Sequence, residues 1–413
     1  MGPMHETDVV VIGAGAAGVA AARQLLAAQI PAVVLEARPR VGGRAWTMRE
    51  PSGMALDLGC GWLHSADENE WAALAPTLGL TVDRTPPPWG GRRRTIAFPS
   101  AEQEDFRAAS ERFFARIDAA ADDPVDRPAS DFLEPGSRWN PLLNAVGNYI
   151  SGGELGCVSA RDLAVYRDTG TNWRVTEGYG ALIQAYAAPL DLRLDCPVTV
   201  IDHSGPRLRV ATPRGDISAR AAIVAVPASI LASEALRFAP ALPDKRAAAH
   251  ALPLGLADKL FLRVDAPESL PTEARLFGAL DQSSTGSYHL RPFGRPVIEC
   301  YFAGRLAWEL EHEGDGAFAR VALDQLAKHL GGDIRKRLHS IAATAWGHDP
   351  HALGSYSYAQ PGKTDARRVL ATPVDDRLFF AGEACSTYDY STAHGAYRTG
   401  VAAANSVAKL LKR

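Results

Sequence analysis

The sequence predicts an α/β fold in which a nucleotide-binding domain is interleaved with a second domain of mixed α+β structure. Three observations support this prediction: a strand, glycine-rich turn and helix near the start, polar helices in the middle, and a later return to short apolar strands and a helix. The chain has 413 residues, of which 46% are hydrophobic, so it is large enough to fill two cores.

A βαβ unit is the first element of the chain. Its parts are the apolar strand 8–12, the glycine-rich turn 13–18, the helix 19–29 and the apolar strand 32–36. This order is typical of a Rossmann-like nucleotide-binding domain.

The glycines of the turn suit a bound pyrophosphate. Gly13 allows a tight turn, Gly15 lets the backbone approach the ligand, and Gly18 lets the helix pack close to the strand. A glycine triplet also occurs in purely structural βα turns, but here Glu36 ends the second strand, where a carboxylate can bind ribose hydroxyls. We therefore predict a dinucleotide whose diphosphate lies on the helix N-terminus.

The remaining elements alternate along the chain. We expect strands at 197–201, 208–210, 221–227, 259–264, 296–302 and 378–381, and helices at 101–121, 179–188, 316–330 and 396–411. Two interleaved domains explain this alternation better than a linear string of domains. The expected segments are 5–84, 175–256 and 347–413 for the nucleotide-binding domain, and 85–174 and 257–346 for the substrate-binding domain.

Charge and cysteine usage exclude several classes of partner. The 44 Lys and Arg residues against 47 Asp and Glu give a formal net charge of -3, which offers no field for nucleic acid or an anionic membrane. The basic run Arg92–Arg94 follows a turn-rich stretch and is interpreted as a solvated loop. Five widely spaced cysteines suggest neither a zinc cluster nor a disulfide framework, and His348 and His351 have no third ligand nearby in sequence, so no metal is expected.

The location expected for the protein is the cytoplasm. Residues 1–8 lack both the basic and the apolar region of a signal peptide, and no segment is apolar for long enough to span a bilayer. Unpaired cysteines fit a reducing compartment.

Several motifs after Glu36 resemble those of flavoproteins. Gly42-Gly43-Arg44, just past this acid, is similar to the FAD signature of the amine oxidase and phytoene desaturase superfamily. Taken alone, the segment also fits a flexible loop that ends in a solvated arginine. The blocks 354–358 and 392–396 resemble more narrowly the flavin-containing amine oxidase family, which includes monoamine oxidases, polyamine oxidases and flavin histone demethylases. This resemblance implies FAD as the cofactor.

The resemblance extends from residue 8 to residue 411 and assigns cofactor contacts to matching positions. The implied contacts are Gly13, Gly15, Ala16, Gly18, Glu36, Ala37, Arg38, Gly43, Arg44, Gly59, Gly61, Trp62, Val198, Trp346, Gly382, Glu383, Thr392 and Ala393. If a helix begins near Thr392, its free N–H groups face the flavin C2=O, where negative charge gathers on reduction. His394 is then interpreted as a helix-start histidine with its hydrogen bonds satisfied, not as a general base. Ser355 replaces the cysteine that carries covalent flavin in monoamine oxidases, so non-covalent FAD is expected.

The resemblance implies two catalytic residues, Lys259 and Tyr356, and a pocket around them. Lys259 matches the lysine that these oxidases hold to flavin N5 through a water, although a lysine that opens an amphipathic strand also fits snorkelling at a surface. Tyr356 is the candidate aromatic wall that orients the amine, and packing on the flavin is its alternative role. Thr392 replaces the second aromatic ring of monoamine oxidases, so the pocket is expected to be half open unless Trp62 or Tyr390 fills it.

The resemblance therefore implies an enzyme that oxidises the C–N bond of a small monoamine or polyamine. A hydride passes to flavin N5, the iminium hydrolyses to an aldehyde or ketone, and dioxygen becomes hydrogen peroxide. The charge of the chain implies no basic surface, so a small amine is expected in place of a histone tail. Glu154, Glu177 and Glu299 are carboxylates that could attract a second ammonium, and each also fits a solvated or paired carboxylate.

Other functions stay open at this point. An L-amino-acid oxidase needs a cation for the substrate carboxylate, and Cys60-Gly61-Trp62 stands where those relatives usually have an arginine. A carotenoid or porphyrinogen dehydrogenase fits the block 354–358 and Lys259 less well. From a different class, a flavin protein without turnover would keep its spectrum when an amine is added anaerobically.

Overall fold

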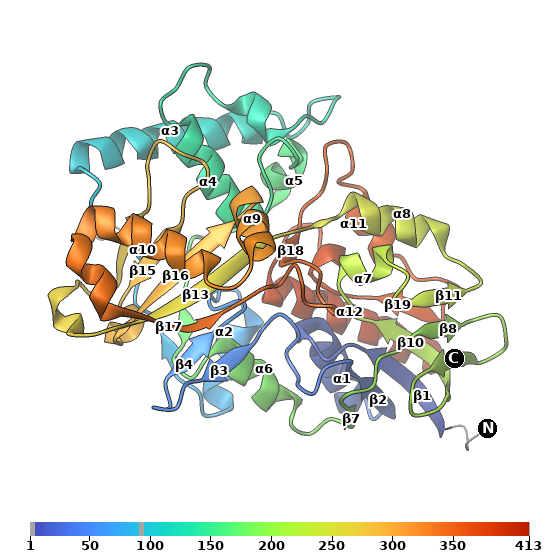
Figure 1. Cartoon of the computed structure of the whole chain (residues 1–413). Coiled ribbons are helices and arrows are strands. Elements are labelled where there is room, and N and C mark those ends of the chain that lie inside the picture. The colour runs from blue at the N-terminus through green and yellow to red at the C-terminus, as the bar shows by residue number, and fades with distance from the viewer. Residues whose placement is uncertain (1–4, 91–94, 413) are drawn as a thin grey trace.

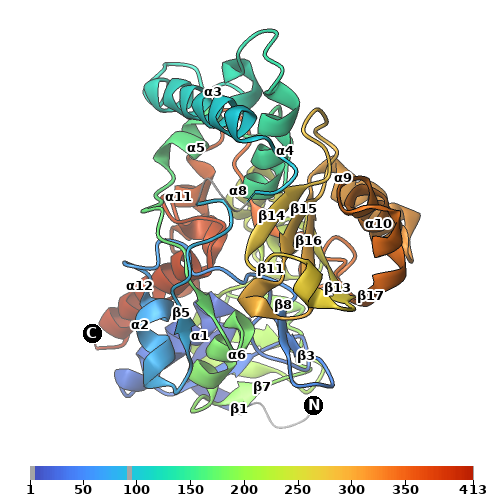
Figure 2. The same ribbon diagram turned by 90° about the vertical axis from the view of Figure 1, so that its left-hand side faces the viewer.

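The computed structural model describes residues 5–90 and 95–412, so the predicted basic loop Arg92–Arg94 lies outside the described residues. An eight-stranded sheet, a five-stranded sheet and a group of helices occupy three separate regions (Figure 1). The quarter turn in Figure 2 shows the helical group at the top and the larger sheet at the bottom.

The eight-stranded sheet contains the predicted βαβ unit. Its order is β11-β8-β9-β10-β1-β2-β7, with β19 beside β10. Its strands are β1 (His5–Ile12), β2 (Ala32–Leu35), β7 (Leu192–Arg193), β8 (Val200–Asp202), β9 (Leu208–Ala211), β10 (Ile217–Val224), β11 (Arg237–Ala239) and β19 (Leu378–Phe380). Strands β10, β1, β2 and β7 run parallel. Alternate residues of β1 enter two different cores, as expected for a strand that is buried on both faces.

Helices cover both faces of this sheet. One face packs against α1 (Ala16–Ala27), α2 (Glu70–Thr77), α6 (Tyr179–Ala187) and α12 (Ala393–Leu411). The other face packs against α7 (Ala228–Ala232), α8 (Pro243–Ala251) and α11 (Ala366–Ala371). The helices α1 and α12 approach closely, and Gly400 makes this possible: a Cβ there would lie 2.1 Å from the Ala17 carbonyl oxygen.

The five-stranded sheet is antiparallel and has the order β14-β15-β16-β13-β17. Its strands are β13 (Ala257–Val264), β14 (Ala274–Phe277), β15 (Ser287–Leu290), β16 (Val297–Ala303) and β17 (Leu338–Ala343). The helices α9 (Arg305–Glu313) and α10 (Ala317–Leu330) cover the face that carries Leu260, Leu262 and Phe302. The opposite face therefore carries Lys259 and Phe261, because side chains alternate along a strand.

The helical group packs on the β14 side of this sheet. Its members are α3 (Ser100–Ala119), η1 (Ala129–Phe132), α4 (Asn140–Ser151) and α5 (Ala160–Val165). Their shared core includes Phe113, Leu142 and Phe277, the last residue of β14. This packing places α4 next to the sheet face that carries Lys259.

Short strand pairs and 3₁₀ turns connect the larger units. The pairs are β3 (Thr47–Arg49) with β4 (Ala55–Asp57), β5 (Val82–Asp83) with β6 (Arg174–Val175), and β12 (Leu254–Gly255) with β18 (Tyr356–Ser357). The 3₁₀ turns are η2 (Pro267–Ser269), η3 (Pro292–Gly294), η4 (Gly332–Arg337) and η5 (Glu383–Cys385). Among the described helices, none has the length and apolarity needed to cross a bilayer.

The predicted α/β class and the predicted βαβ unit are confirmed, whereas several element boundaries are wrong, two of them at residues expected to contact the cofactor. The strand expected at 197–201 begins only at Val200, so Val198 precedes it; Pro197 has no N–H to donate to a sheet. The helix expected at 396–411 begins earlier, at Ala393, because the Thr392 side chain caps it.

The interleaved division into two domains is retained as our proposal. The two cores of the larger sheet draw on residues before 84, between 173 and 254, and after 359, whereas the cores of the smaller sheet and of the helical group draw mainly on residues between 96 and 164 and between 256 and 352. Separate cores support separate domains.

Candidate active site

The glycine-rich turn leaves an open cradle at the N-terminus of α1. Gly13 has φ +103°, and a Cβ there would lie 2.6 Å from the Ala225 carbonyl oxygen. A Cβ at Gly18 would lie 1.8 Å from the Gly13 carbonyl oxygen, so both positions are closed to larger residues. By contrast, the nearest atom to a Cβ at Gly15 is 4.0 Å away, which leaves space for a ligand over the free N–H groups of the helix.

Glu36 lies at the mouth of this cradle, as predicted. Its carboxylate is buried and accepts hydrogen bonds from Ala14 N at 2.7 Å and from Arg38 N at 2.9 Å. The Arg38 guanidinium is fixed in turn by Asp349, with 2.6 Å between Nη2 and Oδ1. The acid is therefore held where ribose hydroxyls of a bound dinucleotide would need an acceptor.

A second group of predicted cofactor residues meets at the ends of β18 and β19. Arg44 Nη1 lies 3.0 Å from Glu383 Oε1 and donates to the Ser355 carbonyl oxygen at 2.6 Å. Burial alone would raise the pKa of Glu383, but Arg44 and the Ser357 hydroxyl outweigh it and lower that pKa, so the pair is ionised. A cavity beside the pair is lined by Arg44, Val226, Gly382 and Glu383.

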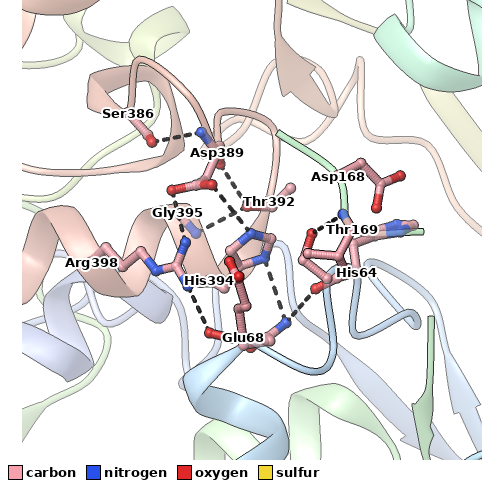
Figure 3. A network of polar contacts seen from close by, with 12 residues as sticks. His64, Glu68, Asp168, Thr169, Ser386, Asp389, Thr392, His394, Gly395 and Arg398 are labelled. Atoms are coloured by element: carbon pink, nitrogen blue, oxygen red, sulfur yellow. Dashed lines mark hydrogen bonds and ion pairs between the residues drawn. The ribbon is translucent and has the colours of Figure 1, made fainter. Parts of the chain in front are cut away.

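The N-terminus of α12 is built from a polar network (Figure 3). Thr392 Oγ1 accepts from Gly395 N at 3.0 Å and donates to the Asp389 carbonyl oxygen at 2.6 Å, and Asp389 Oδ2 binds Arg398 at 3.0 Å. His394 is 1% exposed, and its Nε2 has no hydrogen-bond partner among the described residues; Asp389 Oδ1 is 3.9 Å away. Burial lowers the pKa of His394 to about 4, so the ring is neutral at pH 7. The histidine thus lies at the start of the helix as expected, but its hydrogen bonds are not all satisfied among the described residues.

Lys259 lies on the face of the five-stranded sheet opposite α9 and α10, where it is buried and paired. Its Nζ is 2.7 Å from Glu299 Oε1 and donates to the Asp57 carbonyl oxygen at 2.9 Å. Burial alone would lower the pKa of Lys259, but Glu299 outweighs it and raises that pKa. A Cβ at Gly61 would lie 3.5 Å from Nζ, so the lysine reaches the segment that was predicted to lie under the flavin.

Tyr356 is joined to the same sheet face through two hydroxyl contacts. Its hydroxyl donates to the Tyr149 carbonyl oxygen at 2.6 Å and lies 2.9 Å from the Tyr301 hydroxyl. Tyr301 is in register with Lys259 across β16 and β13, so the structure brings the two predicted catalytic positions to one place. Burial raises the pKa of Tyr356 well above its usual range, so the phenol stays protonated.

Trp62 closes one side of this region. Its ring lies 6.1 Å from the His289 ring and 4.6 Å from the Trp89 ring, and the Arg174 guanidinium is 4.7 Å from its centroid. A cavity next to it is lined by Asp57, Gly61, Trp62, Arg174, Phe293 and Glu299. Trp62 and Glu299, the ion-pair partner of Lys259, therefore line the same cavity.

Other predicted residues have structural partners. Tyr390 is buried, donates to the Asp162 carbonyl oxygen at 2.8 Å and packs under the Arg367 guanidinium at 3.8 Å, so its ring is already occupied. Trp346 donates to the Leu58 carbonyl oxygen at 3.3 Å. The roles of Tyr390, Trp346 and Val198 at a ligand stay predictions.

The sequence analysis missed the partners of the predicted catalytic residues. Glu299 was considered only as a possible ammonium site, and Tyr301 and Tyr149 were not considered. A signal for two of them is present in β16, where Glu299 and Tyr301 alternate with the buried apolar residues Ile298, Cys300 and Phe302. Such alternation predicts that the polar residues share a face.

The observed residues fit FAD. The cradle over Gly15, the carboxylate of Glu36 and the N-terminus of α12 supply a diphosphate site, a ribose acceptor and a positive helix end.

Comparisons with known proteins agree with this fit. Residues 16–147 and 92–408 match the family described as flavin containing amine oxidoreductase. Polyamine oxidase 4 of Oryza sativa subsp. japonica is 31% identical over 97% of this chain and 88% of its own, and lysine-specific histone demethylase 2 of Homo sapiens is 27% identical over 98% of this chain and 54% of its own.

Solved structures share the fold. Cyclohexylamine oxidase from Brevibacterium oxydans superposes with a TM-score of 0.79 at 21% identity, covering 98% of this chain and all of its own. Putrescine oxidase bound to putrescine superposes with a TM-score of 0.77 at 20% identity over the whole of both chains.

Proposed function

The chain belongs to the family of flavin-containing amine oxidoreductases, and from this premise we propose that the site between β13, β16 and the start of α12 oxidises the C–N bond of a small amine. FAD is the cofactor, and when bound it accepts a hydride at N5 and passes the electrons to dioxygen. The reaction consumes the amine, dioxygen and water, and it gives a carbonyl compound, ammonia or a smaller amine, and hydrogen peroxide.

The observation that supports this proposal most is the placement of Lys259. Its Nζ touches the segment at Gly61 and lies on the same sheet face as Tyr301, which contacts Tyr356. The positive charge of Lys259 and the negative charge of Glu299 nearly cancel. The pair would therefore hold a water without creating a strong electric field at the substrate. The amine must react as the uncharged base, because only then is its lone pair free.

The chain would supply three further functions. The turn at Gly15 and the carboxylate of Glu36 would bind the cofactor, Tyr356 and Trp62 would form apolar walls that orient the amine, and the buried sheet face would exclude water from the reacting carbon.

The test is anaerobic mixing of the yellow holoenzyme with a panel of monoamines, diamines, polyamines and amino acids, followed by peroxide measurement in air. We expect at least one amine to bleach the flavin and to yield peroxide. A spectrum that is unchanged by every amine would overturn the proposed activity, and bleaching by α-amino acids alone would replace it with amino-acid oxidation.

A further inference from the structure

An arginine on the Lys259 face of the five-stranded sheet has no ionic partner. Arg275 in β14 is in register with His289 in β15, which is in register with Glu299 in β16. Residues that face each other across antiparallel strands project on the same side, so this row and Lys259 share one face. Arg275 as a whole residue is half-buried.

Three other cations near this face are matched by carboxylates, and Arg295 donates to the carbonyl oxygens of Ala55 and Thr176 at 2.8 Å each. Lys259 is paired with Glu299 at 2.7 Å, and Glu273 binds both Arg174 at 2.7 Å and His289 at 2.7 Å. Each of these three cations therefore has a carboxylate within hydrogen-bond distance.

Arg275 differs from these cations. Its Nε donates to the Ser287 hydroxyl at 3.1 Å, and its guanidinium carbon lies 4.0 Å from the Phe277 ring centroid. Within residues 5–90 and 95–412 it forms no ion pair, and its two terminal nitrogens have no acceptor. Burial lowers the pKa of Arg275 to about 10, so it keeps its charge at neutral pH.

The position of Arg275 relative to Lys259 follows from the sheet. Ser287, which accepts from Arg275, is in register with Tyr301, and Tyr301 is in register with Lys259. Neighbouring strands are about 4.8 Å apart, and three such spacings place β14 roughly 14 Å from β13. The long side chains of Arg275 and Lys259 shorten the distance between their charged groups. Tyr149 and Tyr301, whose rings lie 6.0 Å apart, stand in this part of the molecule.

We propose that Arg275 binds a carboxylate at the far end of the substrate, so that the substrate class is an amine with a terminal acid several bonds from the reacting C–N bond. This inference rests on the proposed amine oxidation. A guanidinium forms two parallel hydrogen bonds to a carboxylate, which fixes both the position and the direction of the chain. The same cation repels the distal ammonium of a polyamine and is too distant for the carboxylate of an α-amino acid.

The experiment compares three amines of equal length on the holoenzyme: 6-aminohexanoate, hexylamine and hexane-1,6-diamine. We expect the highest kcat/KM for 6-aminohexanoate. Arg275→Gln should lower that value by about 30-fold, mainly through KM, because a charge-assisted hydrogen bond is lost, and should change hexylamine oxidation less than about threefold. Arg335→Gln, at an exposed ion pair with Asp324, is the matched control and should change none of the three.

A measurement on the unmodified enzyme covers the case in which the variant does not fold. Hexanoate should perturb the flavin spectrum and compete with the amine at a concentration at least about tenfold lower than hexanamide, its neutral isostere. Equal binding of acid and amide, or faster oxidation of hexylamine or the diamine than of 6-aminohexanoate, would overturn the role of Arg275 while leaving amine oxidation intact. If no amine bleaches the flavin, it is the proposed function that fails.

Discussion

Lys259 and Glu299 form an ion pair diagonally across β13 and β16, with 2.7 Å between Nζ and Oε1. The lysine is charged at neutral pH because Glu299 raises its pKa, and the carboxylate is charged because Lys259 lowers the pKa of Glu299. Removing either partner leaves the other buried without its counter-charge, which is costly. An activity loss at Lys259 must therefore be separated from a stability loss.

Lys259→Met should leave FAD bound and slow turnover at least tenfold, which corresponds to about 1.4 kcal/mol of lost transition-state stabilisation. The reason is that the ammonium and a water beside N5 would assist the charge changes there. The measurement is rapid-reaction kinetics of flavin reduction and reoxidation. The double variant Lys259→Met/Glu299→Gln should regain stability without regaining activity; wild-type rates in either variant would show that the lysine is only structural.

The flavin should be released by acid. Ser355 cannot form a thioether, and its hydroxyl is already engaged with Ala257, accepting from N at 2.9 Å and donating to O at 2.8 Å. Trichloroacetic acid precipitation should leave a colourless pellet and a yellow supernatant. A pellet that stays yellow would contradict non-covalent binding.

Gly18→Ala should abolish FAD binding. Its Cβ would lie 1.8 Å from the Gly13 carbonyl oxygen, so α1 must shift away from the turn that binds the diphosphate. Gly332→Ala is the matched control, because nothing lies within 4 Å of its new Cβ. The ratio of flavin to protein absorbance in the purified variants measures the effect, and full occupancy in Gly18→Ala would refute the role given to the turn.

Tyr356→Ala should lower kcat/KM more than alanine variants of Tyr358, Tyr390 or Trp62 when activity is expressed per bound flavin. Buried aromatic contacts contribute on the order of 1 kcal/mol beyond their area. Normalisation matters because Tyr390 packs under Arg367, so its loss should reduce stability. Tyr356→Phe keeps the aromatic ring, so its kcat/KM should fall less than that of Tyr356→Ala. A larger loss at any of the other three positions would reject the half-open pocket.

The free energy of unfolding should decrease as the pH is lowered below 6.5, and His394 should account for part of this decrease. Its pKa is lowered from 6.5 to about 4 in the folded protein, so as pH falls the unfolded chain binds this proton first. The stability present above pH 6.5 is lost as pH falls from 6.5 towards 4, up to about 3 kcal/mol. Urea denaturation of wild type and His394→Gln from pH 7.5 to 5 measures this. The difference in the free energy of unfolding between the two proteins should become smaller at low pH. A difference that stays constant with pH would show that His394 does not titrate.

The sequence predicted the cofactor half of the site better than the substrate half. Gly13, Gly18 and Glu36 belong to one βαβ unit, whose geometry determines their positions, so one local pattern was sufficient. Lys259 and Tyr356 are distant in sequence and were identified by resemblance alone.

The neighbours of the substrate site depend on strand register, which no local pattern specifies. Arg275 shares a sheet face with Lys259 only because β14, β15, β16 and β13 pair in that order. The pairing of Lys259 with Glu299 likewise needs the diagonal offset between two strands. A slip of one residue would send these side chains to the other face.

The packing of α12 on α1 makes flavin capture depend on the synthesis of α12. A ribosome adds α12 only after every strand of both sheets has been made, and until then the side of α1 at Ala17 is uncovered. The glycine-rich turn would therefore be synthesised early, but the helix that follows it would be covered by α12 only late in synthesis. We expect FAD to enter only chains that contain α12, so that chains cut short before Ala393 stay without flavin and remain targets for proteolysis.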